Sequence, residues 1–276
     1  MFARLLTQAL STSLKQQFIV ENRPGASGNI GSEAVAHAAP DGYTFLVSAN
    51  AALAINPVLQ KSPSFDPERD LATVARGVMA VNVLVVEAST PAKTLSEFIA
   101  LAKKQPGALV YGSAGTGTSP YLGVRKFEEA AGVKFLHAPY KGVAPAYQDL
   151  IGARLQFMYT DLASVMPYIK AGKVVPLAVD RKTSLLPRVP IFAEAGLANF
   201  EAPTSFSVMA PVGTPKPVLQ RMSAEIAKAL NALSLRLEQQ ALVPIYDTPE
   251  QFALSLKAER ASWGNFIKQQ GITADQ

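Results

Sequence analysis

A loop of small residues at 112–119 is the part of the chain whose residue types best suit chemistry. It reads Gly-Ser-Ala-Gly-Thr-Gly-Thr-Ser and separates a predicted strand at 109–111 from a helix predicted to begin at Pro120. Glycines let the backbone turn with its N–H groups exposed, and a helix start adds unpaired donors and a partial positive charge. Such a loop can bind an anion, particularly a carboxylate.

Hydroxyl side chains reinforce this interpretation, since Ser113, Thr116, Thr118 and Ser119 all add donors to the loop. The loop is not a Walker A motif, because no Gly-Lys-Ser/Thr follows, and it does not fit G-x-G-x-x-G either. An ordinary strand-to-helix turn with a Ser/Thr cap has the same composition. Both interpretations remain open at this stage.

Two further positions are candidates. Gly25, Gly28 and Gly31 stand at a spacing of three before a predicted helix, which favours a tight turn over a second anion cradle. Asn50 follows a predicted strand, at the strand end where open α/β sheets bind ligands, although a helix cap explains it equally well.

The sequence contains few residues suited to catalysis or to metal binding. There are two histidines and no cysteine, which excludes disulfides, Cys-ligated metals and a Cys nucleophile. His37 is expected on a helix surface, and His137 is expected to be a structural histidine in a strand. Asp149 and Asp161 have no evident acid–base partner. We therefore expect no catalytic residue, no metal site and no cofactor.

Composition bounds the class of protein. Apolar residues make up 49% of 276 residues and charged residues 17%, so the chain can form a sizeable core. The formal net charge of +5 is mild and no basic run is dense enough for nucleic acid. No apolar stretch approaches the ~20 residues that span a bilayer. The first residues, from Phe2 onward, predict an amphipathic helix rather than a signal peptide.

Predicted strands and helices alternate along the chain, which is typical of α/β folds with mostly parallel sheets. A helix capped by Thr94 is expected, and others begin near Pro217 and Pro249. The strands are predicted at 18–21, 43–47, 81–86, 109–111, 135–137, 155–158, 174–179 and 206–209.

The length suggests two domains, but no linker separates them. We therefore expect the chain to leave one domain and return to it, with strands at 81–86 and 205–209 as the crossings. On this interpretation lobe I comprises residues 1–83 plus 207–276, and lobe II comprises 84–206.

Several stretches, taken in order, resemble the Bug-type (TctC-like) receptors of tripartite tricarboxylate transporters. They cover nearly the whole chain, and the ordered set is specific although each motif alone is weak. The stretches are Val20 to Gly31, Asp41-Gly42-Tyr43, Ile55-Asn56-Pro57, Pro91 to Thr94, Tyr111 to Thr118, Pro139 to Gly142, Pro145-Ala146, Ile169 to Lys173, Leu177 to Val179, and Glu194 to Gly196.

The resemblance implies a type II periplasmic-binding-protein fold, with two α/β lobes joined by two crossing strands. It implies a periplasmic receptor, not an enzyme, that captures a small carboxylate in the interlobe cleft, closes about a hinge and serves membrane permease subunits. A monomer without nucleic-acid partners and without membrane insertion is expected. The ligand-binding residues carried over are Ser48, Asn50, Ser113, Ala114, Thr116, Thr118, Tyr140, Thr160, Asp161 and Ser205.

Departures from the family pattern indicate the kind of ligand. The segment that usually reads Gly-Thr-Asn-Gly-Thr-His is Ser48 to Leu53 here, which keeps Asn50 but makes two polar positions apolar. Thr160 stands where the family often has Asp, with Asp161 one place later, and Ser205 replaces a frequent aromatic residue. These changes predict a ligand without an amino group and with a less polar body than aspartate or glutamate.

The start of the chain also differs, since the family places an export signal, a first strand and a Pro/Gly-rich loop before the helix that matches 2–14. Lobe I is therefore expected to lack its first strand. A start codon assigned too far downstream, a trimmed chain and a shortened receptor all remain open. A sensing subunit that presents its ligand to a signalling partner, and an enzyme that uses the 112–119 loop, are the competing functions.

Overall fold

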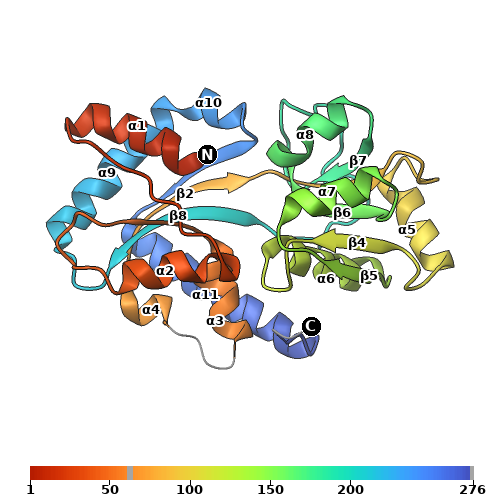
Figure 1. The fold of residues 1–276 in the computed structure, drawn as a ribbon, viewed down its shortest axis with the longest axis horizontal. Coiled ribbons are helices and arrows are strands. Elements are labelled where there is room, and N and C mark those ends of the chain that lie inside the picture. The colour runs from red at the N-terminus through yellow and green to blue at the C-terminus, as the bar shows by residue number, and fades with distance from the viewer. Residues whose placement is uncertain (61–64, 274–276) are drawn as a thin grey trace. The chain divides into compact units, whose positions relative to one another are not determined.

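The structure is a computed structural model that describes residues 1–60 and 65–273. The chain divides into two compact units, each an α/β layer structure (Figure 1). Unit 1 is Met1–Met79 with Ser205–Gln276, and unit 2 is Ala80–Thr204. The sequence analysis expected the boundaries after residues 83 and 206. The two divisions differ only in residues 80–83 and 205–206, where the chain crosses from one unit to the other.

Unit 1 contains a four-stranded sheet of order β1-β8-β2-β9. Its strands are β1 (Leu46–Ala49), β2 (Leu71–Ala80), β8 (Thr204–Pro211) and β9 (Leu242–Asp247). Its helices are α1 (Phe2–Leu14), α2 (Asn29–Ala36), α3 (Asn56–Leu59), α4 (Pro67–Asp70), α9 (Lys216–Ala232), α10 (Ser234–Glu238) and α11 (Pro249–Gln269), with the 3₁₀ turn η1 (Ala26–Gly28) and the π-helical turn η2 (Ala51–Ile55).

The predicted amphipathic helix at the start of the chain is confirmed as α1. Phe2, Leu6 and Leu10 recur on one face and are buried, and the Phe2 ring lies directly over Gly77 of β2. A β-carbon at Gly77 would stand 2.6 Å from this ring, so the close approach depends on glycine.

The strand predicted at 18–21 is wrong. These residues form no ladder, and the Phe18 N–H donates to the Ser11 hydroxyl at 3.1 Å instead of to a neighbouring strand. An extended apolar run becomes a strand only where another strand accepts its backbone hydrogen bonds. Strands β2 and β9 were not anticipated by the sequence analysis.

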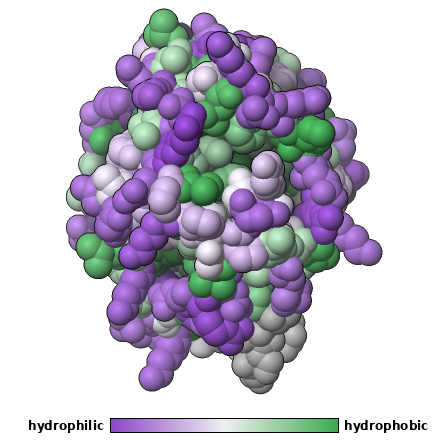
Figure 2. Space-filling model, turned by 90° about the vertical axis from the view of Figure 1, so that its left-hand side faces the viewer, coloured by the Kyte–Doolittle hydropathy of each residue, from purple (hydrophilic) through white to green (hydrophobic). Residues whose placement is uncertain are grey.

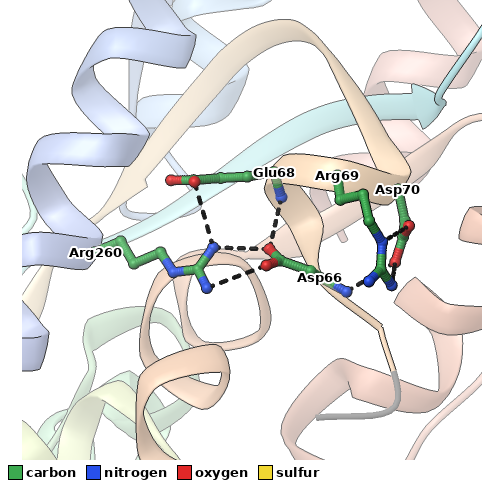
Figure 3. Close-up of polar contacts among 5 residues, drawn as sticks. All are labelled: Asp66, Glu68, Arg69, Asp70 and Arg260. Carbon is green, nitrogen blue, oxygen red and sulfur yellow. Dashed lines mark hydrogen bonds and ion pairs between the residues drawn. The ribbon is translucent and has the colours of Figure 1, made fainter.

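Charged side chains connect the segment before β2 to helix α11 (Figure 3). Asp66 caps α4 by accepting from the Glu68 N–H at 3.0 Å, and Arg260 donates to Asp66 at 2.7 Å and lies 3.7 Å from Glu68. The pKa of Asp66 lies below its ordinary value, and the hydrogen bond from the Arg260 guanidinium is the largest cause. This network fastens the C-terminal helix to α4, which directly precedes β2.

Unit 2 contains a five-stranded sheet of order β5-β4-β6-β3-β7 with helices around it (Figure 1). Its strands are β3 (Asn82–Glu87), β4 (Val110–Ser113), β5 (Leu136–Pro139), β6 (Phe157–Asp161) and β7 (Val174–Val179). Its helices are α5 (Leu95–Lys104), α6 (Ser119–Ala131), α7 (Val143–Ile151) and α8 (Leu162–Lys170).

The directions of these strands decide which residues share an edge. β4 runs parallel to β5 and β6, as expected, whereas β3 runs antiparallel to both β6 and β7. β3 carries the chain into the unit, so it starts at the edge where β4, β5 and β6 end. The core beneath includes a buried aromatic cluster in which Phe98, Phe127 and Phe157 pack together.

Candidate functional site

The loop between β4 and α6 has the form that its sequence predicted. Residues 114–118 are partly exposed, whereas Ser113 and Ser119 at its two ends are buried. Gly115 has a φ of +121°, a conformation that favours glycine, and Thr118 occupies the N-cap position of α6. The loop therefore presents backbone at the start of a 13-residue helix.

Internal hydrogen bonds hold the loop in shape. The Gly115 N–H donates to the Ser113 hydroxyl at 3.1 Å, and the Thr118 hydroxyl donates to the Gly115 carbonyl at 2.7 Å. The N–H groups of Ala114 and Gly117 donate to no other residue in the described part of the chain. These two partly exposed donors, beside the helix start, fit an anionic oxygen.

His137 of β5 lies beside this loop, with its Nε2 2.7 Å from the Ser113 Oγ. The ring packs against both Tyr111 and Tyr121, with ring centroids 4.8 and 4.7 Å away. Burial first, and the nearby Arg125 second, lowers the pKa of His137 to about 4, so the imidazole is neutral at pH 7. His137 was expected to be a structural histidine, and its contact with Ser113 was not anticipated.

Three further predicted residues lie at this edge of the sheet because β5 and β6 end beside β4. Tyr140 follows β5, and its N–H donates to the Ser113 carbonyl at 2.9 Å. Its hydroxyl donates to Asp149 at 2.6 Å, and Arg154 pairs with the same carboxylate at 2.6 Å. The phenol of Tyr140 therefore has an internal partner.

Thr160 and Asp161 end β6 and take part in one polar network. The Thr160 hydroxyl lies 2.7 Å from the Tyr147 hydroxyl, which also contacts Ser164. Asp161 caps α8, since its carboxylate accepts from the Ser164 N–H at 2.9 Å and from the Ser164 hydroxyl at 2.6 Å. Both oxygens of Asp161 thus have partners within unit 2.

A polar group at the same edge was not identified from the sequence. Asn82 begins β3 and is buried, and its N–H and side-chain amide donate to the two oxygens of Asp180 at 3.0 and 3.1 Å. Thr204 donates to the Asn82 side chain at 3.4 Å. Burial raises the pKa of Asp180. No local motif marks these residues, because β3, β7 and β8 bring them together.

Unit 1 brings together Asn50 and Ser205, two of its three predicted residues. The Ser205 N–H donates to the Asn50 side-chain oxygen at 3.4 Å, and the Asn50 amide donates to Glu259 of α11 at 2.6 Å. Asn50, Ser205 and Glu259 all belong to unit 1. Ser48 stands apart on β1, where its hydroxyl lies 3.4 Å from that of Ser32.

The glycine run at 25–31 forms the turn that opens α2. Gly25 and Gly28 have φ values of +121° and +96°, and Asn56 donates to Asn29 at 2.8 Å behind the turn. A β-carbon at Gly28 would lie 3.3 Å from the Ala52 side chain. The tight turn with close packing, which the sequence analysis favoured, accounts for these glycines.

Residues 1–60 and 65–273 contain no group of three or more His, Cys, Asp or Glu side chains arranged to hold a metal ion. In the same part of the chain, no helix combines the length and apolar character needed to traverse a bilayer. Hydrophilic residues cover much of the face shown in Figure 2, with apolar residues between them.

Comparison with known proteins identifies the family. The profile of the Tripartite tricarboxylate transporter family receptor, TctC, matches residues 2–272. The chain belongs to this receptor family. Among its relatives, protein BugT of Bordetella pertussis is 32% identical over 275 residues, which cover 98% of this chain and 84% of BugT.

Solved structures agree with this assignment. An R. palustris protein solved with adipate has 31% identity and a TM-score of 0.91, covering 99% of this chain and 93% of its own. MatC from Rhodopseudomonas palustris, with bound malate, has 27% identity and a TM-score of 0.84, covering 96% and 93%. The family and fold are those of solute-binding receptors rather than enzymes.

Proposed function

We propose that this chain is a periplasmic receptor that captures a small carboxylate and delivers it to the permease subunits of a tripartite tricarboxylate-type transporter. Membership of the receptor family supports this proposal, as do the adipate and malate held by two structural relatives. The expectation of a monomer without nucleic-acid partners is kept as part of the same proposal.

The loop at residues 112–119 is the observation that carries the proposal. It offers the N–H groups of Ala114 and Gly117 and the start of α6, and it contains no charged residue. Uncharged donors of this kind suit a carboxylate that must later be released, because each hydrogen bond is modest while the set gives direction.

We assign different roles to the predicted residues. Asn50, Ser205 and Tyr140 make internal hydrogen bonds, so we assign them to shaping the site. Ser113 and Thr118 hold the loop. Direct contact with the ligand is proposed for Ser48, Ser113, Ala114, Thr116, Thr160 and Asp161.

The ligand is proposed to lack an amino group. An ammonium group bound inside a protein needs an anionic partner, and Thr160 stands where the family often has an aspartate that pairs with polar ligand groups. Ala49 and Ala52 stand near Asn50 at positions where the family usually has threonine, which favours an apolar ligand body. An aliphatic or aromatic acid meets both conditions.

Isothermal titration calorimetry with matched ligands tests the proposal. We expect adipate or another amino-free acid to bind, its uncharged diamide to bind far more weakly, and aspartate to bind weakly or not at all. Equal affinity for the acid and its diamide would contradict a carboxylate site, and tight selective binding of aspartate would contradict the ligand class. Loss of uptake of the same acid on deletion of the gene would support the transporter role.

A further inference from the structure

The contact between His137 and Ser113 raises a question about where hydrogens lie at the proposed carboxylate site. His137 Nε2 and Ser113 Oγ are 2.7 Å apart, so one of them donates to the other. A neutral imidazole carries a hydrogen on only one of its two nitrogens. Which nitrogen carries it decides what the Ser113 hydroxyl can offer a ligand.

The hydroxyl of Ser113 has two possible hydrogen-bonding arrangements. Its Oγ already accepts from the Gly115 N–H at 3.1 Å, and the Gly115 carbonyl is a poor acceptor for it at 3.4 Å. If Nε2 of His137 has no hydrogen, the hydroxyl donates to the ring and has nothing left for an anion. If Nε2 carries the hydrogen, Oγ accepts from the ring and its own hydrogen is available.

The residues around His137 hold its ring in place but do not determine which ring nitrogen carries the hydrogen. Tyr111 of β4 and Tyr121 of α6 pack against the ring, and Arg125 of α6, paired with Glu128 at 2.6 Å, is the nearby cation. Nδ1 of His137 makes no hydrogen bond to any residue within 1–60 or 65–273. The choice between the two forms is therefore left to what binds at Ser113.

We propose that His137 is a positioning residue that carries its hydrogen on Nε2 when a carboxylate is bound, so that the Ser113 hydroxyl donates to the carboxylate. The inference rests on the proposed function, because it needs an anion at the loop. It explains why a half-buried neutral histidine stands behind a loop built from uncharged groups. Specificity for a carboxylate over a neutral ligand then depends partly on a residue that does not touch the ligand.

A double-mutant cycle measured by calorimetry with adipate, or with the acid that binds best, tests this role. We expect S113A and H137F each to weaken binding by about tenfold, because S113A removes the donor to a charged group and H137F removes the N–H that orients this donor. We expect the double variant to be no weaker than S113A alone, because His137 acts through Ser113. H137Q, which keeps an N–H donor on a side chain of similar reach, should bind more tightly than H137F.

Ser96 is exposed on α5, so S96A is the matched control for S113A and should bind as the wild type does. Melting curves of all variants identify any loss that comes from misfolding. Independent losses in S113A and H137F that add in the double variant would overturn the role of His137. So would wild-type affinity in H137F.

A measurement on the wild-type protein reports the position of the hydrogen directly and needs no change at Ser113 or His137. The chain has two histidines, so ¹⁵N-histidine labelling gives two ring systems, and H37Q assigns them. We expect the signals of His137 to report a hydrogen on Nε2 with ligand bound. A hydrogen on Nδ1 in the complex would overturn only the inference, whereas a wild-type chain that binds no carboxylate would overturn the proposed function and this inference with it.

Discussion

The side-chain amide of Asn50 donates a hydrogen bond of 2.6 Å to Glu259, a residue 209 positions later in the chain. Glu259 also lies 3.8 Å from Arg76, which in turn pairs with Asp247 at 3.7 Å. The C-terminal helix α11 thus fixes the orientation of an amide at the end of β1. The side-chain oxygen of Asn50 is left to accept from Ser205.

Removing this carboxylate should destabilise unit 1. In E259A, the Asn50 amide loses an acceptor and Arg76 loses a counter-charge in a mostly buried setting, so we expect a loss of about 1–3 kcal/mol in the free energy of unfolding. Urea denaturation measures it. The exposed Glu129→Ala is the control and should change stability by less than about 0.5 kcal/mol. Equal stability of E259A and the control would show that the contacts of Glu259 with Asn50 and Arg76 do not stabilise unit 1.

Glu128 gives a sharper comparison, because its carboxylate is buried while its neighbour Glu129 is exposed. It accepts from Arg125 at 2.6 Å and from the Phe135 N–H at 2.7 Å. We expect E128A to lose at least about 2 kcal/mol of unfolding free energy, E128Q to lose less because it keeps an acceptor for Phe135, and E129A to lose almost nothing. Similar losses in E128A and E129A, measured by urea denaturation, would show that burial of this carboxylate is unimportant.

Two helical glycines should respond to alanine with opposite signs. A β-carbon at Gly123 of α6 would lie 2.5 Å from the ring of Tyr159, which is 1% exposed and cannot move aside. G123A should therefore cost about 1–3 kcal/mol. At Gly264 of α11 the nearest atom would be 3.7 Å away, so G264A should gain about 0.5–1 kcal/mol through better helix propensity. Thermal melting of both variants measures the contrast, and a rise in melting temperature for G123A would contradict the predicted clash.

Acid should destabilise the protein partly through His137. Its pKa falls from 6.5 to about 4 in the fold, through burial first and Arg125 second, so the unfolded chain takes up this proton at a higher pH than the folded chain. The contribution to stability is complete above about pH 6.5 and declines as pH falls towards 4. The other titratable groups in contact with the ring are the phenols of Tyr111 and Tyr121.

Replacing the titrating group should remove this dependence. We expect the melting temperature of H137Q to fall less steeply than that of the wild type between pH 6.5 and pH 4. His37 is exposed at the end of α2, and H37Q is the matched control. Equal changes in the two variants would show that the effect does not come from the buried ring.

Local signals in the sequence were sufficient for several elements. Thr94 caps α5 as expected, in a capping box completed by Glu97, and the apolar spacing from Phe2 predicts α1 correctly. The glycine and hydroxyl loop at 112–119 was also recognisable, because backbone freedom and a following helix are properties of adjacent residues. These features depend on contacts within a few positions of the chain.

Other features required the tertiary structure, because their partners are distant in sequence. Residues 18–21 have the composition of a strand but find no neighbouring strand, whereas β2 and β9 become strands by pairing across the sheet of unit 1. Likewise, the sequence alone identified Asn50 and Ser113 as candidate residues. Only the fold placed Glu259 beside the first and His137 beside the second, since hydrogen bonds form between atoms that packing brings within 3 Å.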